Sequence, residues 1–227
     1  MSKTSHSKQS NLKLNFIYNV GYQILVIFLP LITTPYISRV LGPEKLGVYS
    51  YTHSVANYFL LFVMLGVANY GNRCIAQVRE DKDKLSHTFW SIYKFQLLRS
   101  VAVLIAYIAY IVLFERDYLP IALLQSIYVF SGMLDISWFF FGMEQFKITI
   151  LRNAIIRIAN LCLIFVFVKN VNDLWKYTLI MTVGVVFSQG YLWYYLPRFV
   201  TRVRVEMRDL VPHIKPELIL FVPVIAV

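Results

Sequence analysis

The chain has 227 residues, of which 58% are hydrophobic and only 15% are charged, with a formal net charge of +10. Soluble domains usually carry about 25% charged residues, so this composition excludes an ordinary soluble enzyme or binding domain and predicts an integral membrane protein. The apolar runs are long and continuous, which favours transmembrane helices over a β-barrel. The two cysteines lack metal-ligand spacing, so neither a zinc site nor a disulfide framework is predicted.

Six apolar segments are each long enough to cross a bilayer core, which takes about 20 helical residues. They are predicted at residues 14–38, 46–70, 88–114, 118–141, 148–168 and 177–197. The fold class expected is therefore all-α, a polytopic bundle of membrane helices. Pro30 and Pro35 are expected to kink or break the first span. Residues 1–13 read as a basic N-terminal tail, and 198–217 as a basic linker after the sixth span.

Lys and Arg residues are distributed unequally between the two ends of the predicted spans. If successive spans alternate in direction, fourteen of these residues lie on the side of the N-terminus and only five on the other side. By the positive-inside rule, this asymmetry predicts a cytoplasmic N-terminus. It also accounts for the net charge without a nucleic-acid partner. The basic segment 198–215 is in addition a candidate for contact with anionic membrane lipids.

Polar side chains recur inside the fifth span, where a charge at membrane depth costs at least about 2.5–3.5 kcal/mol. Asn153, Arg157 and Asn160 follow i, i+4, i+7 spacing and so share one helix face. Arg152 directly precedes them. In the fourth span, Asp135 is a candidate ion-pair partner for Arg157 or Arg152. These residues are typical of a wet cavity inside a bundle.

Other predicted spans carry polar positions as well. Gln23 lies in the first span, and His53 and Asn57 lie in the second. Together with the fifth span, they are what a shared aqueous cavity would require. The alternative is that such side chains only bond one helix to another, for about 0.6–2 kcal/mol each. Lys94 and Arg99 in the third span are expected to snorkel to the cytoplasmic face.

Sequence motifs that would indicate catalysis are missing from the chain. It contains no glycine-rich phosphate loop, no His-Glu-x-x-His and no Gly-x-Ser-x-Gly. We therefore expect neither an enzyme nor a bound cofactor or metal.

Three stretches are similar to bacterial polysaccharide repeat-unit transporters: PLITTPYISRVLGPEKLGVYSYTHSVANYF at 30–59, LGVANYGNR at 65–73 and DISWFFFGMEQFKITILRN at 135–153. These are the Wzx-type O-antigen and capsule flippases of the polysaccharide transport family, in the MOP superfamily. The resemblance implies two lobes of helices around a central cavity. Residues 14–197 would then be the six-helix N-lobe, 218–227 would begin a seventh span that is cut short, and the C-terminal lobe would be a missing partner.

The resemblance also implies a function. The substrate would be an oligosaccharide on undecaprenyl diphosphate, flipped across the bacterial cytoplasmic membrane for surface polysaccharide biosynthesis. Polysaccharide polymerase and chain-length machinery would be further partners. Arginine side chains fork onto phosphate oxygens, so Arg39, Arg73, Arg152 and Arg157 are the candidates for contact with the diphosphate. Gly42, Gly47, Gly66 and Gly71 in the same motifs are expected to permit turns and close helix approach.

Three other interpretations stay open from the sequence. A MATE-like drug or cation exporter of the same superfamily should carry acidic residues in its cavity, whereas here Asp135 is the one acidic residue expected inside the membrane. A membrane glycosyltransferase or polymerase should carry a large extramembrane loop with carboxylates or histidines, which this chain lacks. An inactive truncated product is the third.

Overall fold

The computed structural model describes residues 3–210, 212, 216 and 217, and all regular structure within them is helical. The longer helices are α1 (Lys3–Met64), α2 (Val67–Val78), α3 (Lys82–Phe114), α4 (Leu119–Ser131), α5 (Ser137–Gly142), α6 (Phe146–Phe167) and α7 (Leu174–Tyr195). Short 3-10 turns η1 (Gly132–Leu134), η2 (Val171–Asp173), η3 (Leu196–Arg198) and η4 (Met207–Asp209) complete the order. The all-helical prediction is confirmed for these residues.

Helix α1 consists of two arms joined at Gly42, where the backbone leaves helical geometry with φ 77° and ψ 165°. Glycine has no Cβ and tolerates this positive φ, and the following Pro43 disfavours a helical conformation at the residue before it. Pro30 and Pro35, where a kink or break was predicted, lie inside the helix of the first arm, so the helix is not broken at either proline. The predicted first two spans thus correspond to the two arms, 3–41 and 43–64, and residues 3–13 continue the first arm as helix.

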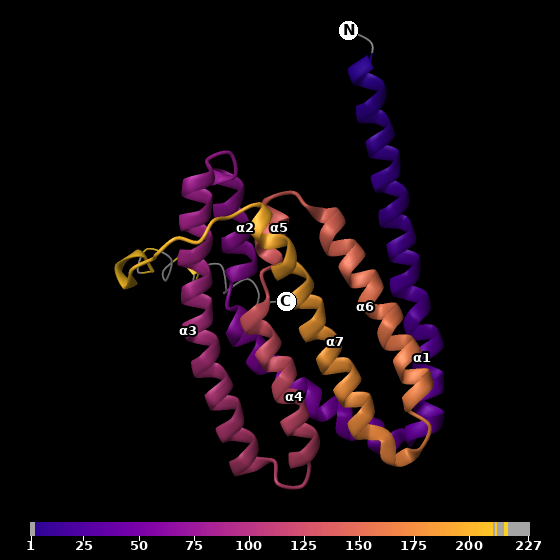
Figure 1. Cartoon of the computed structure of the whole chain (residues 1–227). Helices are drawn as coiled ribbons and strands as arrows, with labels where there is room; N and C mark the ends of the chain where they lie inside the picture. Colours follow the sequence, from indigo (N-terminus) through magenta and orange to yellow (C-terminus); the bar gives the residue numbers. More distant parts are fainter. Residues whose placement is uncertain (1–2, 211, 213–215, 218–227) are drawn as a thin grey trace.

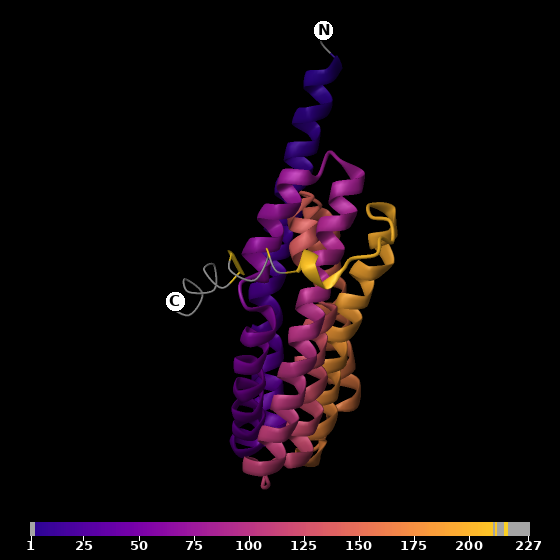
Figure 2. The same cartoon turned by 90° about the vertical axis from the view of Figure 1, so that its left-hand side faces the viewer.

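The helices α3, α4, α7 and α6 lie side by side, and α1 packs against α3, α4 and α6 (Figure 1). Seen from the side, the bundle is elongated along the helix axes, and the start of α1 extends beyond it (Figure 2). Five helical stretches within the described residues are long and apolar enough to cross a membrane: Val26–Val78, Lys82–Phe114, Leu119–Gly142, Phe146–Phe167 and Val171–Arg198. The first of them contains the later part of the first arm of α1, the whole second arm, and α2. Residues 218–227, predicted to begin a seventh span, lie outside the described residues.

Buried apolar side chains form three clusters between these helices. One joins α2, α3, α5 and the end of α7 around Phe89, Trp138 and Phe139. A second joins the Gly42 region of α1 to the α6–α7 connection, and a third joins the second arm of α1 to α3 and α4. Many large apolar side chains nevertheless stay exposed along the helices, such as Ile105 and Leu113. Such an exposed apolar surface suits a bundle surrounded by lipid.

The loops gather at two ends, as the alternating topology predicted. The start of α1, the α2–α3 loop, the α5–α6 loop and the end of α7 lie at one end, and the Gly42 bend, the α3–α4 turn and the α6–α7 connection lie at the other (Figure 1). The first end is the one that carries the predicted excess of Lys and Arg. In its α2–α3 loop, Asp81 accepts a hydrogen bond from the backbone N of Lys84. That bond and the Lys84 ammonium hold the pKa of the Asp81 carboxyl below its usual value.

The predicted fourth span is not one continuous helix. It consists of α4, the turn η1 and α5, with non-helical backbone at Asp135 and Ile136. A break in a buried helix frees carbonyl groups that need donors. The buried Gln96 amide donates to the carbonyls of Gly132 and Asp135 at 2.8 and 2.9 Å, and its own Oε1 accepts from Trp138 Nε1 at 3.0 Å.

Two more bonds fix the same break. Trp193 Nε1 of α7 donates to the Leu134 carbonyl at 2.9 Å, and Asp135 Oδ1 accepts from the backbone N of Ser137 at 2.8 Å. The break is therefore held by side chains from α3 and α7 as well as by its own aspartate. The carbonyls of Gly132, Leu134 and Asp135 therefore have partners within the protein.

We expect Gln96→Leu to destabilise the protein strongly. The substitution roughly keeps the size of the side chain, but it removes the donor to the carbonyls of Gly132 and Asp135 and the acceptor of Trp138 Nε1. Each buried group left unpaired costs about 1–3 kcal/mol. Thermal unfolding of the purified protein in detergent measures the loss. Gln77→Leu, at an exposed position of α2, is the matched control and should change the midpoint little. Equal unfolding midpoints for Gln96→Leu and Gln77→Leu would contradict the role of Gln96 in stabilising the helix break.

Candidate functional site

Arg152 lies in the second turn of α6 and is buried, with 7% of the residue exposed. Its Nε donates to Asn153 Oδ1 at 3.1 Å, and its Nη1 donates to Ser137 Oγ at 3.2 Å and to Gln189 Oε1 at 3.1 Å. Ser137 is the first residue of α5, and Gln189 is a buried residue of α7. The guanidinium therefore ties together three helices through neutral acceptors, in a place where an unsatisfied charge would be costly.

A cavity of about 480 Å³, called the polar cavity below, opens beside this arginine, between the first arm of α1, α6 and α7, and both polar and apolar side chains line it. Its polar lining consists of Thr33, Arg152, Asn153, Arg157, Asn160, Tyr177, Ser188 and Gln189. Two arginines are in this set, and no Asp or Glu among the described residues lines the cavity. The arrangement offers cationic, amide and hydroxyl groups, which suits an anionic or hydroxyl-rich ligand.

Asn153, Arg157 and Asn160, which the i, i+4, i+7 spacing places on one face of α6, all line this cavity. Arg157 is exposed and makes no hydrogen bond or ion pair with another described residue. The Asn160 amide lies against Gly184 of α7, where an added Cβ would come within 2.4 Å of Asn160 Oδ1. Gly184 is therefore the residue that lets α6 and α7 approach closely enough to place Asn160 in the cavity.

Some members of this site were not among the sequence candidates. Ser188 and Gln189 come from α7, where Gln189 shares helical spacing with the buried Thr178 and Thr182. That stripe was a usable signal, although it points equally to helix–helix bonding. Ser137 gave no signal, because its role depends on the break before α5.

His53 and Asn57 belong to a different cluster, on the second arm of α1. His53 Nδ1 lies 3.3 Å from Oε1 of the buried Gln125, and Asn57 Oδ1 accepts from Tyr128 Oη at 3.2 Å. The His53 ring also packs against the rings of Tyr49 and Tyr128. No group of three or more His, Cys, Asp or Glu that could hold a metal occurs in the part of the chain that the structure describes.

The remaining sequence candidates lie apart from the Arg152 cavity. Arg39 is exposed near the Gly42 bend, at the opposite end from Arg73, which is exposed on α2. Gln23 is exposed on the first arm of α1 and does not line the cavity. Asp135, proposed as a partner of Arg152 or Arg157, makes no ion pair within the described residues; its carboxylate caps the start of α5 instead.

Lys94 and Arg99 of α3 were predicted to extend to the cytoplasmic face, but their side chains bind other parts of the protein instead. Lys94 Nζ donates to the Val205 carbonyl at 2.8 Å. Arg99 donates to the Val63 carbonyl at 3.0 Å and forms a 2.5 Å ion pair with Glu217, which is fully buried. The segment after α7 passes across α3 (Figure 1) and supplies the Val205 carbonyl to Lys94. Arg99 has one acceptor in α1, the Val63 carbonyl, and a second in Glu217.

The glycines of the family-like motifs have separate roles. Gly42 and Gly66 have positive φ values of 77° and 82°, as turns require, and a Cβ at Gly71 would come within 2.5 Å of the Trp138 ring. These observations confirm the prediction at three positions. At Gly47, however, a Cβ would meet no atom within 4 Å, so this glycine is not needed for close packing.

Comparison with known proteins agrees with the helical membrane architecture. Residues 12–213 match the family described as polysaccharide biosynthesis protein. Two relatives share the name "Putative O-antigen transporter": one from Escherichia coli (strain K12) is 27% identical over 74% of this chain and 41% of its own length, and one from Shigella dysenteriae is 23% identical over 85% and 51%. The chain thus spans about half the length of these relatives. No solved structure matches it. This chain is a multi-pass membrane protein that belongs to the polysaccharide biosynthesis protein family.

Proposed function

We propose that the chain is one lobe of a transporter that flips undecaprenyl-diphosphate-linked oligosaccharide repeat units across the bacterial cytoplasmic membrane. The observation that carries this proposal is the buried Arg152 at the edge of a cavity lined by amide, hydroxyl and guanidinium groups. A diphosphate and a sugar chain cannot cross hydrocarbon unaided, since unpaired polar groups are costly there. The cavity would replace their water with protein donors and acceptors.

The positive charge of the residues that line the cavity favours an anionic substrate over the cationic substrate of a drug exporter. Arg152 and Arg157 line it, and the described lining contains no carboxylate that would attract a cation. Asp135, the acidic residue that the exporter hypothesis needed, is engaged with the backbone of Ser137. The names of both relatives, as O-antigen transporters, support the same choice.

The topology of the proposed transporter follows from the two arms of α1. Counting each arm as a span gives six spans in residues 3–198. Residues 218–227, which lie outside the described residues, would begin a seventh span ahead of a second lobe. The end of the bundle that is rich in Lys and Arg would face the cytoplasm, so the N-terminus would be cytoplasmic. Contacts with the polymerase and the chain-length machinery are part of the same proposal.

Complementation tests the proposed activity directly. The chain, alone and joined to the second half of the Escherichia coli relative, is expressed in a strain that lacks its repeat-unit transporter, and surface polysaccharide is assayed. We expect the joined form to restore it. Failure of both forms, despite correct insertion in the membrane and a matched sugar, would favour the exporter alternative.

Arg157→Ala should lower transport at unchanged protein abundance, because Arg157 faces the cavity without bonding any described residue. A charge-assisted hydrogen bond contributes about 1.5–3 kcal/mol, so a loss of about tenfold or more is expected. The measurement is the rate of surface polysaccharide formation together with a membrane immunoblot. Arg116→Ala, in the exposed turn at the opposite end, is the control. Normal transport by Arg157→Ala, or loss through degradation alone, would refute its role.

Arg152 should behave differently, because it is both structural and cationic. Arg152→Gln should lower transport and also the unfolding temperature, since Ser137 and Gln189 lose their charged donor. Arg152→Lys keeps the charge but cannot contact two helices with a planar fork, so it should recover part of the transport. Measuring rate and unfolding temperature on the same variants separates the two roles. If lysine and glutamine are equally inactive while equally stable, charge is not what the site uses.

A further inference from the structure

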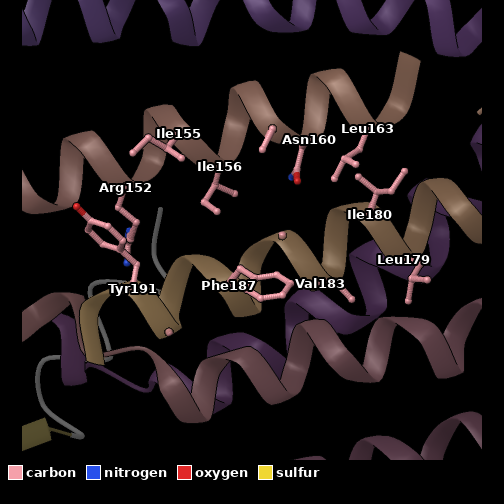
Figure 3. A pocket seen from close by; sticks show the side chains of 13 residues that line it. Arg152, Ile155, Ile156, Asn160, Leu163, Leu179, Ile180, Val183, Phe187 and Tyr191 are labelled. Carbon is pink, nitrogen blue, oxygen red and sulfur yellow. The ribbon is translucent and has the colours of Figure 1, made fainter. Parts of the chain in front are cut away.

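A second cavity, of about 600 Å³, lies in the groove between α6 and α7 (Figure 3). Most of the side chains that line it are apolar, among them Ile155, Leu163, Val183 and Phe187, and Gly190 also lines it. Ile155 and Phe187 are 49% and 67% exposed, so the groove is open to whatever surrounds the bundle. The groove is lined almost wholly by carbon, in contrast to the polar cavity on the side of α1.

The groove is apolar along its length but has a cation at one end. Arg152 and Tyr191 lie together at that end, and Leu163 and Leu179 lie at the other (Figure 3). From Arg152 to Leu163 the helix rises about 16 Å, roughly half the thickness of a bilayer core. The cationic end is near the start of α6 and the end of α7, which is the end of the bundle rich in Lys and Arg.

The two cavities meet at the same residues. Arg152, Ile156 and Asn160 line both the apolar groove and the polar cavity. Gly184 permits this, because it lets α7 pass directly beside the Asn160 amide. A molecule with a long apolar chain, an anionic group and a polar head therefore has a matching environment for each part. The groove suits the chain, Arg152 suits the anionic group, and the polar cavity suits the head.

We propose that the α6–α7 groove binds the polyprenyl chain of a polyprenyl diphosphate, with the diphosphate at Arg152 and the sugar end in the polar cavity. This inference rests on the proposed function and adds the place of the lipid chain. An apolar chain gains about 25 cal/mol for each Å² of surface removed from contact with water, but surrounding lipid offers the same apolar contact. Selectivity for this lipid over others must therefore come from the diphosphate bound at the cationic end. The groove keeps the prenyl chain aligned with the bound diphosphate.

Photolabelling of the purified full chain in lipid nanodiscs tests this site. The probe is a polyprenyl diphosphate that carries a diazirine in its prenyl chain, and labelled residues are mapped by mass spectrometry. Competitors are the unlabelled polyprenyl diphosphate, the polyprenol without phosphate, and phosphatidylglycerol. We expect labels on α6 and α7 at groove residues such as Leu163 and Phe187, with at least tenfold stronger competition by the diphosphate than by either other lipid.

A substitution that fills part of the groove tests the same site, and it has a matched control on α1. A Cβ at Gly190 meets no atom within 4 Å, so Gly190→Leu narrows the groove without a clash at the backbone. Gly47→Leu makes the same change at a position equally open but on α1, away from the groove. Groove labelling should fall at least fivefold in Gly190→Leu and stay unchanged in Gly47→Leu, with equal unfolding temperatures for both proteins.

The outcomes separate this inference from the proposed function. Diphosphate-selective labelling at the groove supports it. Selective labelling elsewhere on the chain overturns the groove and leaves the transporter proposal standing, and equal competition by phosphatidylglycerol reduces the groove to an ordinary lipid-facing surface. No diphosphate-selective labelling anywhere contradicts the groove, and complementation then decides independently whether the transporter proposal stands.

Discussion

The arrangement of this bundle depends on a helix break whose freed carbonyls are satisfied inside the protein. Residues 132–136 interrupt the fourth predicted span, and Gln96 and Trp193 donate hydrogen bonds to their carbonyls from two neighbouring helices. Without those donors, each exposed carbonyl at membrane depth would cost several kcal/mol. The break is therefore stable only in the packed bundle, and it turns α5 away from α4 toward α2 and α6.

That turn places Ser137 beside Arg152. The guanidinium then contacts α5, its own helix and α7 at once, so the cation that looks like a ligand group also holds the packing of the site. The acceptors on Asn153, Ser137 and Gln189 are neutral. A packed, hydrogen-bonded cation is also pre-organised, which reduces the cost of ordering it when a ligand arrives.

The two sides of the α6–α7 pair differ in chemistry. One side is the polar cavity, which the first arm of α1 also lines, and the other is the apolar groove. A lipid-linked sugar has the same division between head and chain. Gly184 holds the two helices close enough for Asn160 and Arg152 to serve both sides, which a bulkier residue would prevent.

The class of this protein follows from its composition. Long apolar runs have no stable conformation in a bilayer other than helix, so the helices and their approximate ends followed from composition, and the i, i+4, i+7 spacing of Asn153, Arg157 and Asn160 placed them on one face because helical geometry is local. The position of the bend and the partners of the polar side chains became visible in the folded structure. It showed that Gly42 rather than the prolines turns α1, that Asp135 caps α5 instead of pairing with an arginine, and that Arg39, Arg73 and Gln23 lie apart from the cavity. Each of these depends on which distant residues meet, and periodicity along one helix carries no information about its neighbours.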